Sequence, residues 1–351
     1  MNNEHFMRHA LELAEQGRYT VSPNPMVGCV LVREGTVIAE GLHRKAGEAH
    51  AEIDALGRCP DARGATMYVT LEPCSHHGRT PPCSDAVIAA GVRRVVVAMT
   101  DPHDLVHGRG IERLRDAGIE VTTGICEAEA RRLNEKFLWS ATQKLPFVLL
   151  KAAMTFDGKL ATVSGDSQWI TTEPARERSL ALREEYDAIL VGSGTIKADN
   201  PRLTRRLGLA GTPWTRVVLD GDGEIPAHAQ VLGDGGRTLL YTSSPPLDRH
   251  PGVEVITAEA RLDLRNVLGE LHARGIHSVI VEGGSVVHGE IIARSLWQKM
   301  IVFVAPMVVG GRDAPSIFSS PPVQRLTDAH RFRFDRAEFV GRDLMLVAYP
   351  A

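Results

Sequence analysis

Short apolar segments typical of β-strands alternate with helix-like segments along this chain, and the alternation stops and restarts once. The first series ends with a helix-like stretch at residues 128–140, and a break follows at residues 142–146. A strand-like stretch at residues 147–153 then opens a second series. Because 351 residues exceed the usual size of one domain, we expect two layered α/β domains, residues 1–145 and 146–351.

Hydrophobic periodicity and turn residues locate the individual elements. In the first domain they predict helices at residues 4–16, from about 50, at 83–90, 111–117 and 128–140, and strands at 27–32, 36–40, 65–71 and 94–99. In the second they predict strands at residues 147–153, 188–191, 216–219, 238–241, 278–281 and 299–305, and helices at 174–185, 264–273 and 286–295.

Charge and composition narrow the class of partner. Forty basic and 43 acidic residues give a net charge of −3, which lacks the basic footprint of a nucleic-acid binder. The first residues lack the apolar core of a signal peptide, and no apolar stretch is long enough to span a membrane. Five cysteines do not suggest a disulfide framework. We therefore expect a cytoplasmic protein that binds a small molecule, with no nucleic-acid or membrane partner.

Four residues of the first domain form a pattern typical of zinc hydrolysis: His50, Glu52, Cys74 and Cys83. One imidazole and two thiolates suit Zn²⁺, and three protein ligands leave the fourth position for water. Zinc lowers the pKa of such a water from about 16 towards about 7. On a helix Glu52 projects away from His50, so it can stay unliganded and move the proton to the ring nitrogen and the leaving amine. The sequence predicts one zinc ion per chain, with Glu52 as the catalytic residue.

The same motif resembles a known family. His-Ala-Glu at residues 50–52 followed by Pro73-Cys74 is the signature of cytidine-deaminase-like zinc hydrolases. The nine-residue step from Cys74 to Cys83, the whole stretch at residues 70–83, and Pro-Asn-Pro at residues 23–25 resemble the bifunctional riboflavin-biosynthesis deaminase/reductase. The resemblance implies a three-layer cytidine-deaminase-like domain. It also implies a diaminopyrimidinone substrate that carries ribose 5-phosphate and loses its C2 amine as ammonia.

Three further residues of this domain are candidate substrate contacts by the resemblance. Asn24 lies between two prolines, and His76 and Arg79 lie in the loop between the two cysteines and suit a phosphate. Asn24 has an alternative role, because an Asn beside prolines can simply organise a turn. The family usually has Asp-Pro-Asn-Pro where this chain has Asp101-Pro102-His103-Asp104, and no role is assigned to His103 or Asp104.

The second domain has no Gly-x-Gly-x-x-Gly fingerprint after its first strand, so a Rossmann domain is not indicated. Two glycine sites follow strands instead, at residues 191–195 and 281–285, and the second could place a helix N-terminus against a phosphate. These sites, with Lys151, the Ser-Gln-Trp-Ile-Thr run at residues 167–171 and the Asp199-to-Arg206 segment, resemble in order the reductase domain of the same family. The resemblance implies a dihydrofolate-reductase-like α/β fold and NADPH as cofactor.

The resemblance also implies ligand contacts in this domain. Those to the pyrimidine ribosyl phosphate are Ser167, Arg183, Leu203, Arg206 and Glu282. Those to NADPH are Ala153, Trp169, Thr195, Asp199, Gly221 and Gly284. The two arginines can hold a phosphate bidentately, whereas Trp169 could pack on the cofactor or fill the core. The implied reaction is hydride transfer to C1′ of the opened ribose, giving a ribityl chain.

Assembly and two alternative functions remain open on the sequence alone. We expect a homo-oligomer, either a dimer or a tetramer. The chain departs from the family at residues 296–300, a segment suited to packing or to subunit contacts. The first alternative is a deaminase of free nucleosides or of RNA, which the near-neutral charge and the long cysteine spacing disfavour. The second is a C-terminal half that binds a nucleotide without reducing anything.

Overall fold

The computed structural model describes residues 2–75, 81–102, 108–244, 250–257, 262–319 and 321–351. They form two compact units: Met1–Lys144 with residues 210–212, and Leu145–Leu209 with Pro213–Ala351. No helix of the described residues is both long enough and apolar enough to cross a membrane.

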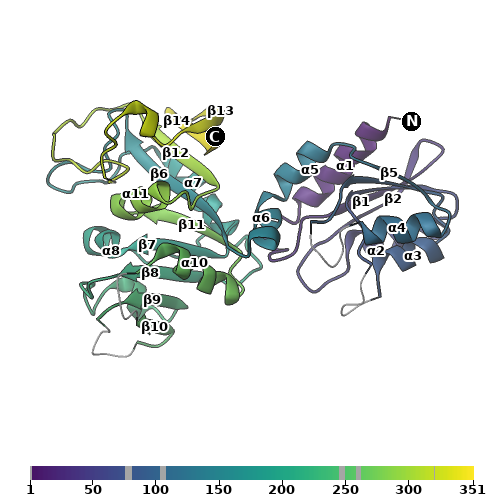
Figure 1. Cartoon of the computed structure of the whole chain (residues 1–351), viewed down its shortest axis with the longest axis horizontal. Helices are drawn as coiled ribbons and strands as arrows, with labels where there is room; N and C mark the ends of the chain where they lie inside the picture. Colours follow the sequence, from purple (N-terminus) through teal and green to yellow (C-terminus); the bar gives the residue numbers. More distant parts are fainter. Residues whose placement is uncertain (1, 76–80, 103–107, 245–249, 258–261, 320) are drawn as a thin grey trace. The chain divides into compact units, whose positions relative to one another are not determined.

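The first unit is a mixed sheet between two layers of helices. Its elements are α1 (Asn3–Glu15), β1 (Gly28–Arg33), β2 (Thr36–Leu42), α2 (Ala51–Gly57), β3 (Thr66–Leu71), α3 (Cys83–Ala89), β4 (Arg94–Met99), α4 (Arg109–Asp116), β5 (Glu120–Thr123), α5 (Glu127–Leu133) and α6 (Glu135–Gln143). The sheet order is β2-β1-β3-β4-β5, with β3, β4 and β5 parallel and β1 antiparallel to both of its neighbours. Helices α1 and α5 cover one face, and α2, α3 and α4 cover the other (Figure 1).

Two glycines allow helices to approach this sheet closely. A Cβ atom at Gly28 in β1 would lie 1.9 Å from the carbonyl oxygen of Ala10 in α1. A Cβ atom at Gly41 in β2 would lie 2.3 Å from the carbonyl oxygen of Ala51 in α2. Any larger residue would push these helices away. The close contact at Gly41 sets the start of α2, and with it His50 and Glu52, against the sheet.

The second unit contains a nine-stranded sheet of order β10-β9-β8-β7-β11-β6-β12-β14-β13. Its elements are β6 (Phe147–Thr155), α7 (Glu173–Glu184), β7 (Ala188–Gly192), α8 (Ser193–Asp199), β8 (Thr215–Asp220), α9 (Gln230–Gly233), β9 (Thr238–Thr242), β10 (Val253–Thr257), α10 (Leu264–Ala273), β11 (Ser278–Gly283), α11 (Ser285–Ala293), β12 (Lys299–Ala305), the 3₁₀ turn η1 (Leu326–Asp328), β13 (Phe332–Val340) and β14 (Asp343–Pro350). From β10 at one edge as far as β12, each strand in this order is parallel to the next. At the other edge β14 is antiparallel to β12, and β13 is antiparallel to β14.

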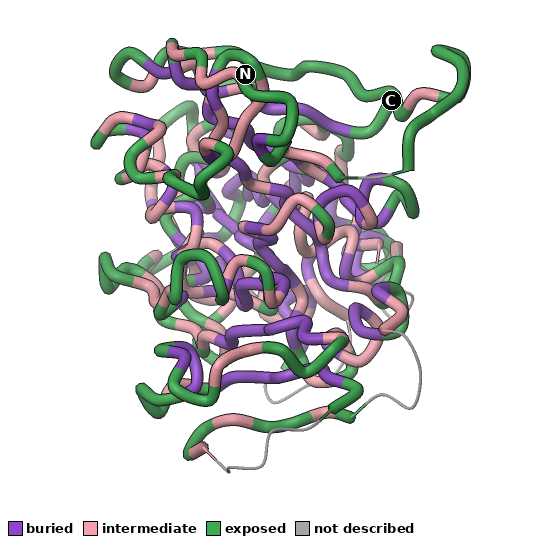
Figure 2. The backbone as a smooth tube through the Cα atoms, turned by 90° about the vertical axis from the view of Figure 1, so that its left-hand side faces the viewer, coloured by how far each residue is buried: buried purple, intermediate pink, exposed green. Residues whose placement is uncertain are grey.

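Burial follows the central strands. Every residue of β7, β8 and β9 is buried, and buried stretches run through the interior in Figure 2 while exposed segments lie around it. The segment at residues 296–300 belongs to this core, since Leu296, Trp297 and Met300 are buried. Gln298 there accepts a hydrogen bond from the backbone N–H of Val148 at 2.8 Å. The departure from the family pattern is therefore accommodated by core packing within the unit.

The prediction of one continuous helix at residues 128–140 is wrong. The stretch at residues 128–140 forms two helices, α5 and α6, which meet at Asn134. The buried Asn134 side chain accepts from the N–H of Met26 at 2.7 Å and donates to its carbonyl at 2.9 Å. These two bonds hold Asn134 outside helical geometry, at φ −101° and ψ 20°, and the helix breaks there.

Candidate functional sites

The predicted zinc ligands converge in the first unit. His50 is the N-cap of α2, Cys74 follows β3, and Cys83 is the first residue of α3. The Nδ1 atom of His50 lies 3.2 Å from Sγ of Cys83 and 3.7 Å from Sγ of Cys74, and the three ligand atoms all lie within 4.8 Å of one another. Each residue stands at an element boundary, where its side chain can leave the core.

The chemistry of this donor set fits zinc. Two sulfurs and one imidazole nitrogen are zinc ligands, and three of them leave a position open for a reacting molecule. The N–H of Cys83 donates to Sγ of Cys74 at 3.2 Å, which favours the thiolate. The hydrogen bond from the Cys83 thiol lowers the pKa of Cys74 to about 4, and the same bond together with burial raises the pKa of Cys83. This arrangement favours a thiolate at Cys74.

Glu52 lies in the same cavity as His50 and Cys74, a space of about 260 Å³. Its side chain is buried on α2, and this burial raises the pKa of Glu52 from 4.5 to about 7. A carboxylate with a pKa near neutrality can both accept and release a proton at the pH of the cell. Glu52 is therefore suited to general acid–base work.

Asn24 lines the same cavity beside a buried histidine. His43 places Nδ1 3.0 Å from the carbonyl oxygen of Ala49, and Nε2 3.0 Å from Nδ2 of Asn24. A carbonyl can only accept, so Nδ1 carries the proton; burial lowers the pKa of His43, which leaves Nε2 to accept from Asn24. This hydrogen bond orients the Asn24 amide. Its Oδ1 has no hydrogen-bond donor among the described residues and can accept a hydrogen bond from a ligand.

Glu72, next to the Pro-Cys motif, has a structural role. Its buried carboxylate accepts backbone N–H groups of Asp101 (3.2 Å), Gly108 (2.9 Å), Gly110 (2.8 Å) and Ile111 (3.3 Å). These bonds satisfy donors at the start of α4 and fix the end of β3, from which Cys74 follows. The predicted contacts His76 and Arg79, and the unassigned His103 and Asp104, lie outside the described residues.

A second cavity of about 690 Å³ lies in the second unit, at the ends of β6, β7 and β11. Most of the residues predicted there to contact ligands line it. These are Ala153, Ser167, Trp169, Arg183, Thr195, Asp199, Leu203, Arg206, Glu282 and Gly284. Gly221 is not among the lining residues; it follows β8, and its carbonyl accepts a hydrogen bond from the Ser243 hydroxyl.

Glu282 and Arg183 form a buried ion pair in this cavity. Nε and Nη2 of Arg183 donate to the two carboxylate oxygens of Glu282 at 2.6 and 2.9 Å, and Nζ of Lys151 lies 3.6 Å from Glu282. Burial alone would raise the pKa of Glu282, but the two cations lower it to about 2. Nη1 of Arg183 donates to the carbonyl of Thr204 at 3.1 Å, so this guanidinium is engaged within the protein.

Arg206, Trp169 and Asp199 also line this cavity, and each has different surroundings. No ion pair or hydrogen bond within the described part of the chain engages the guanidinium of Arg206. Trp169 is 66% exposed, and the guanidinium of Arg176 stacks 4.6 Å above its ring, so Trp169 does not fill the core. Burial raises the pKa of Asp199, an effect that its hydrogen bond with Ser167 partly offsets.

Several lining residues were not predicted as ligand contacts. In the first cavity these include His43 and Phe137, and in the second His288, Arg176 and Gln230. His288 lies on α11 four residues after Gly284, one helical turn from a glycine predicted to bind cofactor, and this spacing is a signal that could have found it. Phe137 and Gln230 have no such signal, because only the tertiary fold brings them to a cavity.

Comparison with known proteins finds a family model for each half of the chain. Residues 1–99 match the family model "Cytidine and deoxycytidylate deaminase zinc-binding region", and residues 146–346 match "RibD C-terminal domain". The chain is 42% identical to riboflavin biosynthesis protein RibD of Bacillus amyloliquefaciens over 99% of this chain and 96% of that protein. It is 40% identical to RibD of Escherichia coli K12, over 99% of each.

The solved structures agree as well. The diaminohydroxyphosphoribosylaminopyrimidine deaminase/5-amino-6-(5-phosphoribosylamino)uracil reductase of Thermotoga maritima superposes with a TM-score of 0.91, at 38% identity over 99% of each chain. RibD of Acinetobacter baumannii gives a TM-score of 0.90, at 36% identity over 99% of each chain. These matches confirm the expected cytidine-deaminase-like and dihydrofolate-reductase-like folds.

The Glu282 ion pair makes a testable contribution to stability. Glu282→Gln removes the charge that Arg183 and Lys151 stabilise, so we expect a loss of about 2–3 kcal/mol in the free energy of unfolding at neutral pH. A carboxyl whose pKa falls from 4.5 to about 2 on folding contributes fully above the unfolded value. The loss should therefore be constant above about pH 5 and shrink as the pH falls from 4.5 towards 2.

Urea unfolding of both proteins at several pH values measures this difference. Glu290→Gln is the control, since Glu290 pairs with Arg294 at the surface and should cost under about 1 kcal/mol. A loss independent of pH, or one as large in the control, would contradict the assigned role of the buried pair.

Proposed function

Because this chain belongs to the RibD family of riboflavin-biosynthesis proteins, we propose that its two units catalyse two successive steps on one pyrimidine ribosyl phosphate. The chain is a bifunctional enzyme that joins a zinc-dependent deaminase to an NADPH-dependent reductase. We assign deamination to residues 1–145 and reduction to residues 146–351. The first substrate is 2,5-diamino-6-ribosylamino-4(3H)-pyrimidinone 5′-phosphate, and the final product is 5-amino-6-ribitylaminouracil 5′-phosphate.

One observation carries the deaminase assignment: three zinc-type ligand atoms lie within 4.8 Å of one another, and two of the residues that bear them, His50 and Cys74, line a cavity together with the buried carboxyl of Glu52. His50, Cys74 and Cys83 would hold the metal, whose Lewis acidity makes a water molecule deprotonate near neutral pH. Glu52 would accept one proton of the attacking water and pass it to the ring nitrogen. It would then carry the second proton of that water, released as the new carbonyl forms, to the amine, which leaves as ammonia.

The chain's other residues in this unit recognise the substrate. Asn24 presents its Oδ1 as an acceptor for an N–H group of the pyrimidine. His76 and Arg79 bind the phosphate by charge-assisted hydrogen bonds. The alternative role of Asn24, the organisation of a turn, does not explain its hydrogen bond with His43 in the cavity.

The reductase assignment follows from the cationic second cavity. The guanidinium of Arg206 has no internal partner among the described residues, so it is the group that binds the substrate phosphate. Ser167, Leu203 and the Glu282–Arg183 pair contact the rest of the pyrimidine ribosyl chain. NADPH supplies a hydride to C1′ of the opened ribose, present as an imine, and the protein's task is to bring the two together. The residues proposed to bind NADPH are Ala153, Trp169, Thr195, Asp199, Gly221 and Gly284.

We also propose that the enzyme is a cytoplasmic homo-oligomer assembled through strand β13. No residue of β13 is buried, and its Phe334 and Phe339 are 63% and 78% exposed at the edge of the nine-stranded sheet. An edge strand that exposes large apolar side chains favours pairing with another chain. The five cysteines are free, which suits a reducing compartment.

Glu52→Gln should retain zinc but lower the rate of ammonia release by about 100-fold or more, because the amide cannot accept the proton. Zinc content and ammonia release from the diaminopyrimidinone are measured on the same preparation. Glu48→Gln, an exposed change close to the zinc ligands, is the control. Ammonia release at the wild-type rate would remove Glu52 from the mechanism.

Arg206→Ala should raise the KM for the deaminated pyrimidine in reduction by about 10- to 100-fold, the effect of losing a charged hydrogen bond to phosphate. Ammonia release should be unchanged. Arg265→Ala, which removes an exposed arginine on α10, serves as the control in the NADPH oxidation assay. Equal loss of both activities would indicate misfolding or coupled units, and unchanged reduction would contradict the phosphate contact.

Phe334→Asp should shift the enzyme towards monomers, since a charge in an apolar interface has no partner there. Analytical ultracentrifugation of the full chain measures the shift. Phe156→Asp, at a residue that is also exposed (75%) but lies outside β13, is the control. An unchanged assembly in Phe334→Asp would contradict the role of this edge.

A further inference from the structure

The segment at residues 200–207 places ligand contacts in the reductase cavity without any helix or strand of its own. Leu203 and Arg206 project from it, and it contains two non-glycine residues in left-handed conformation, Asn200 (φ 41°) and Leu203 (φ 55°). Such backbone persists only when its surroundings hold it. The hydrogen bonds of this segment therefore decide where its side chains lie.

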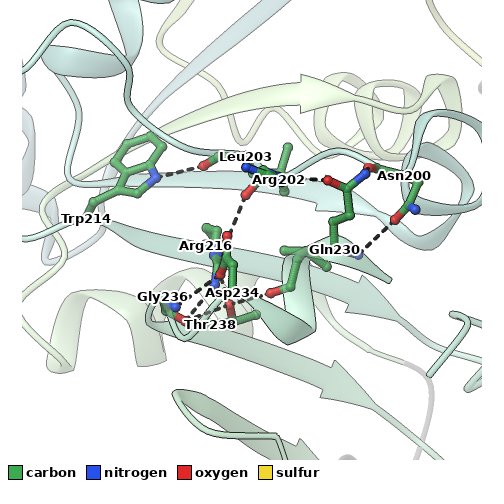
Figure 3. Close-up of polar contacts among 10 residues, drawn as sticks. Asn200, Arg202, Leu203, Trp214, Arg216, Gln230, Asp234, Gly236 and Thr238 are labelled. Atoms are coloured by element: carbon green, nitrogen blue, oxygen red, sulfur yellow. Dashed lines mark hydrogen bonds and ion pairs between the residues drawn. The ribbon is translucent and has the colours of Figure 1, made fainter. Parts of the chain in front are cut away.

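Side chains from neighbouring elements each donate a hydrogen bond to one backbone carbonyl of the segment. Nε1 of Trp214 donates to the carbonyl of Leu203 at 2.8 Å, and Nη1 of Arg216 donates to the carbonyl of Arg202 at 3.2 Å (Figure 3). At its start, Nε2 of Gln230 donates to the carbonyl of Asn200 at 2.9 Å.

The far end of the segment is held from α7. The buried carboxylate of Glu184 accepts the N–H groups of Arg206 and Leu207 at 3.2 and 3.0 Å. The guanidinium of Arg205 lies 4.5 Å over the ring of Trp214 and donates to the carbonyl of Arg183 at 3.0 Å. Arg206, between these contacts, is the residue whose guanidinium remains available to the cavity.

Arg216 is the centre of this network. Its side chain is 2% exposed, and its Nη1 lies 2.6 and 2.7 Å from the two carboxylate oxygens of Asp234. Nε donates to the hydroxyl of Thr238 at 2.9 Å, and Nη2 to the carbonyl of Gly236 at 2.6 Å. With this many partners the guanidinium can take one position only, so its bond to Arg202 ties the segment to strands β8 and β9 (Figure 3).

We propose that Trp214 and Arg216 are positioning residues of the reductase, which hold residues 200–207 so that Leu203 and Arg206 meet the pyrimidine ribosyl phosphate. The inference rests on the proposed function of Arg206 and deepens it. Neither side chain needs to touch the substrate. Their effect falls on substrate binding, because a mobile segment must be ordered each time the substrate binds.

Trp214→Phe tests this role, because it keeps an aromatic ring under Arg205 and deletes only the N–H donor. The KM for 5-amino-6-(5-phosphoribosylamino)uracil should rise about fivefold, the effect of one lost hydrogen bond. The kcat should stay within about twofold, and the Kd of NADPH should not change, because its proposed contacts lie outside the segment. Trp139→Phe is a matched control, since Nε1 of Trp139 has no hydrogen-bond partner among the described residues.

Gln230→Ala is the second variant; the Gln230 side chain is exposed, so we expect this variant to fold. It should raise the same KM, since it frees the carbonyl of Asn200. An unchanged KM in Trp214→Phe, or in Gln230→Ala if the first variant does not fold, would overturn the inference, and so would an equal rise in Trp139→Phe. Turnover by the wild-type enzyme distinguishes a failure of the proposed function from a failure of the inference. No turnover by wild type would contradict the proposed function and the inference with it, whereas wild-type turnover with unchanged KM in the variants would contradict only the inference.

Discussion

Each unit is built on buried parallel strands, and both sites lie at the carboxyl ends of these strands. β7 contains only apolar residues and glycine, and the buried charged groups of the two sites lie at or just after the carboxyl ends of β3 and β11. There Glu72 and Glu282 are buried and must be satisfied, the first by backbone N–H groups and the second by Arg183. These two carboxylates hold the residues around them and so define the shape of each site.

The two sites use polar groups in opposite ways. In the first site burial raises the pKa of Glu52 to about 7, which suits a group that exchanges a proton near neutral pH. In the reductase site Glu282 is buried against two cations, which keep it ionised. The first arrangement suits proton transfer. The second serves binding and orientation, as expected where the cofactor performs the chemistry.

Much of this could be predicted from the sequence, because local patterns determine it. The strand at Arg94–Met99 and the helix at Leu264–Ala273 have the predicted bounds, since each is a periodic apolar run with clear limits. The zinc-type ligands could be predicted because His50, Cys74 and Cys83, in this order along the chain, form a pattern that is seldom purely structural. Ten of the eleven contacts predicted for the second unit line one cavity, and the exception is Gly221.

The rest depends on contacts between residues far apart in the chain. Nothing local indicates that Asn134 bonds to Met26 and breaks a helix, or that Arg183 is occupied by Glu282, 99 residues away. In strand β13 an irregularity in register between Phe334 and Arg336 shifts the alternation of apolar and polar residues, which makes the strand hard to identify from periodicity. The most direct test of the whole account is NADPH oxidation after the diaminopyrimidinone ribosylamino phosphate is added to zinc-loaded enzyme. We predict oxidation that requires this substrate and stops when zinc is removed; oxidation that persists without zinc, or none at all, would contradict two sequential activities in one chain.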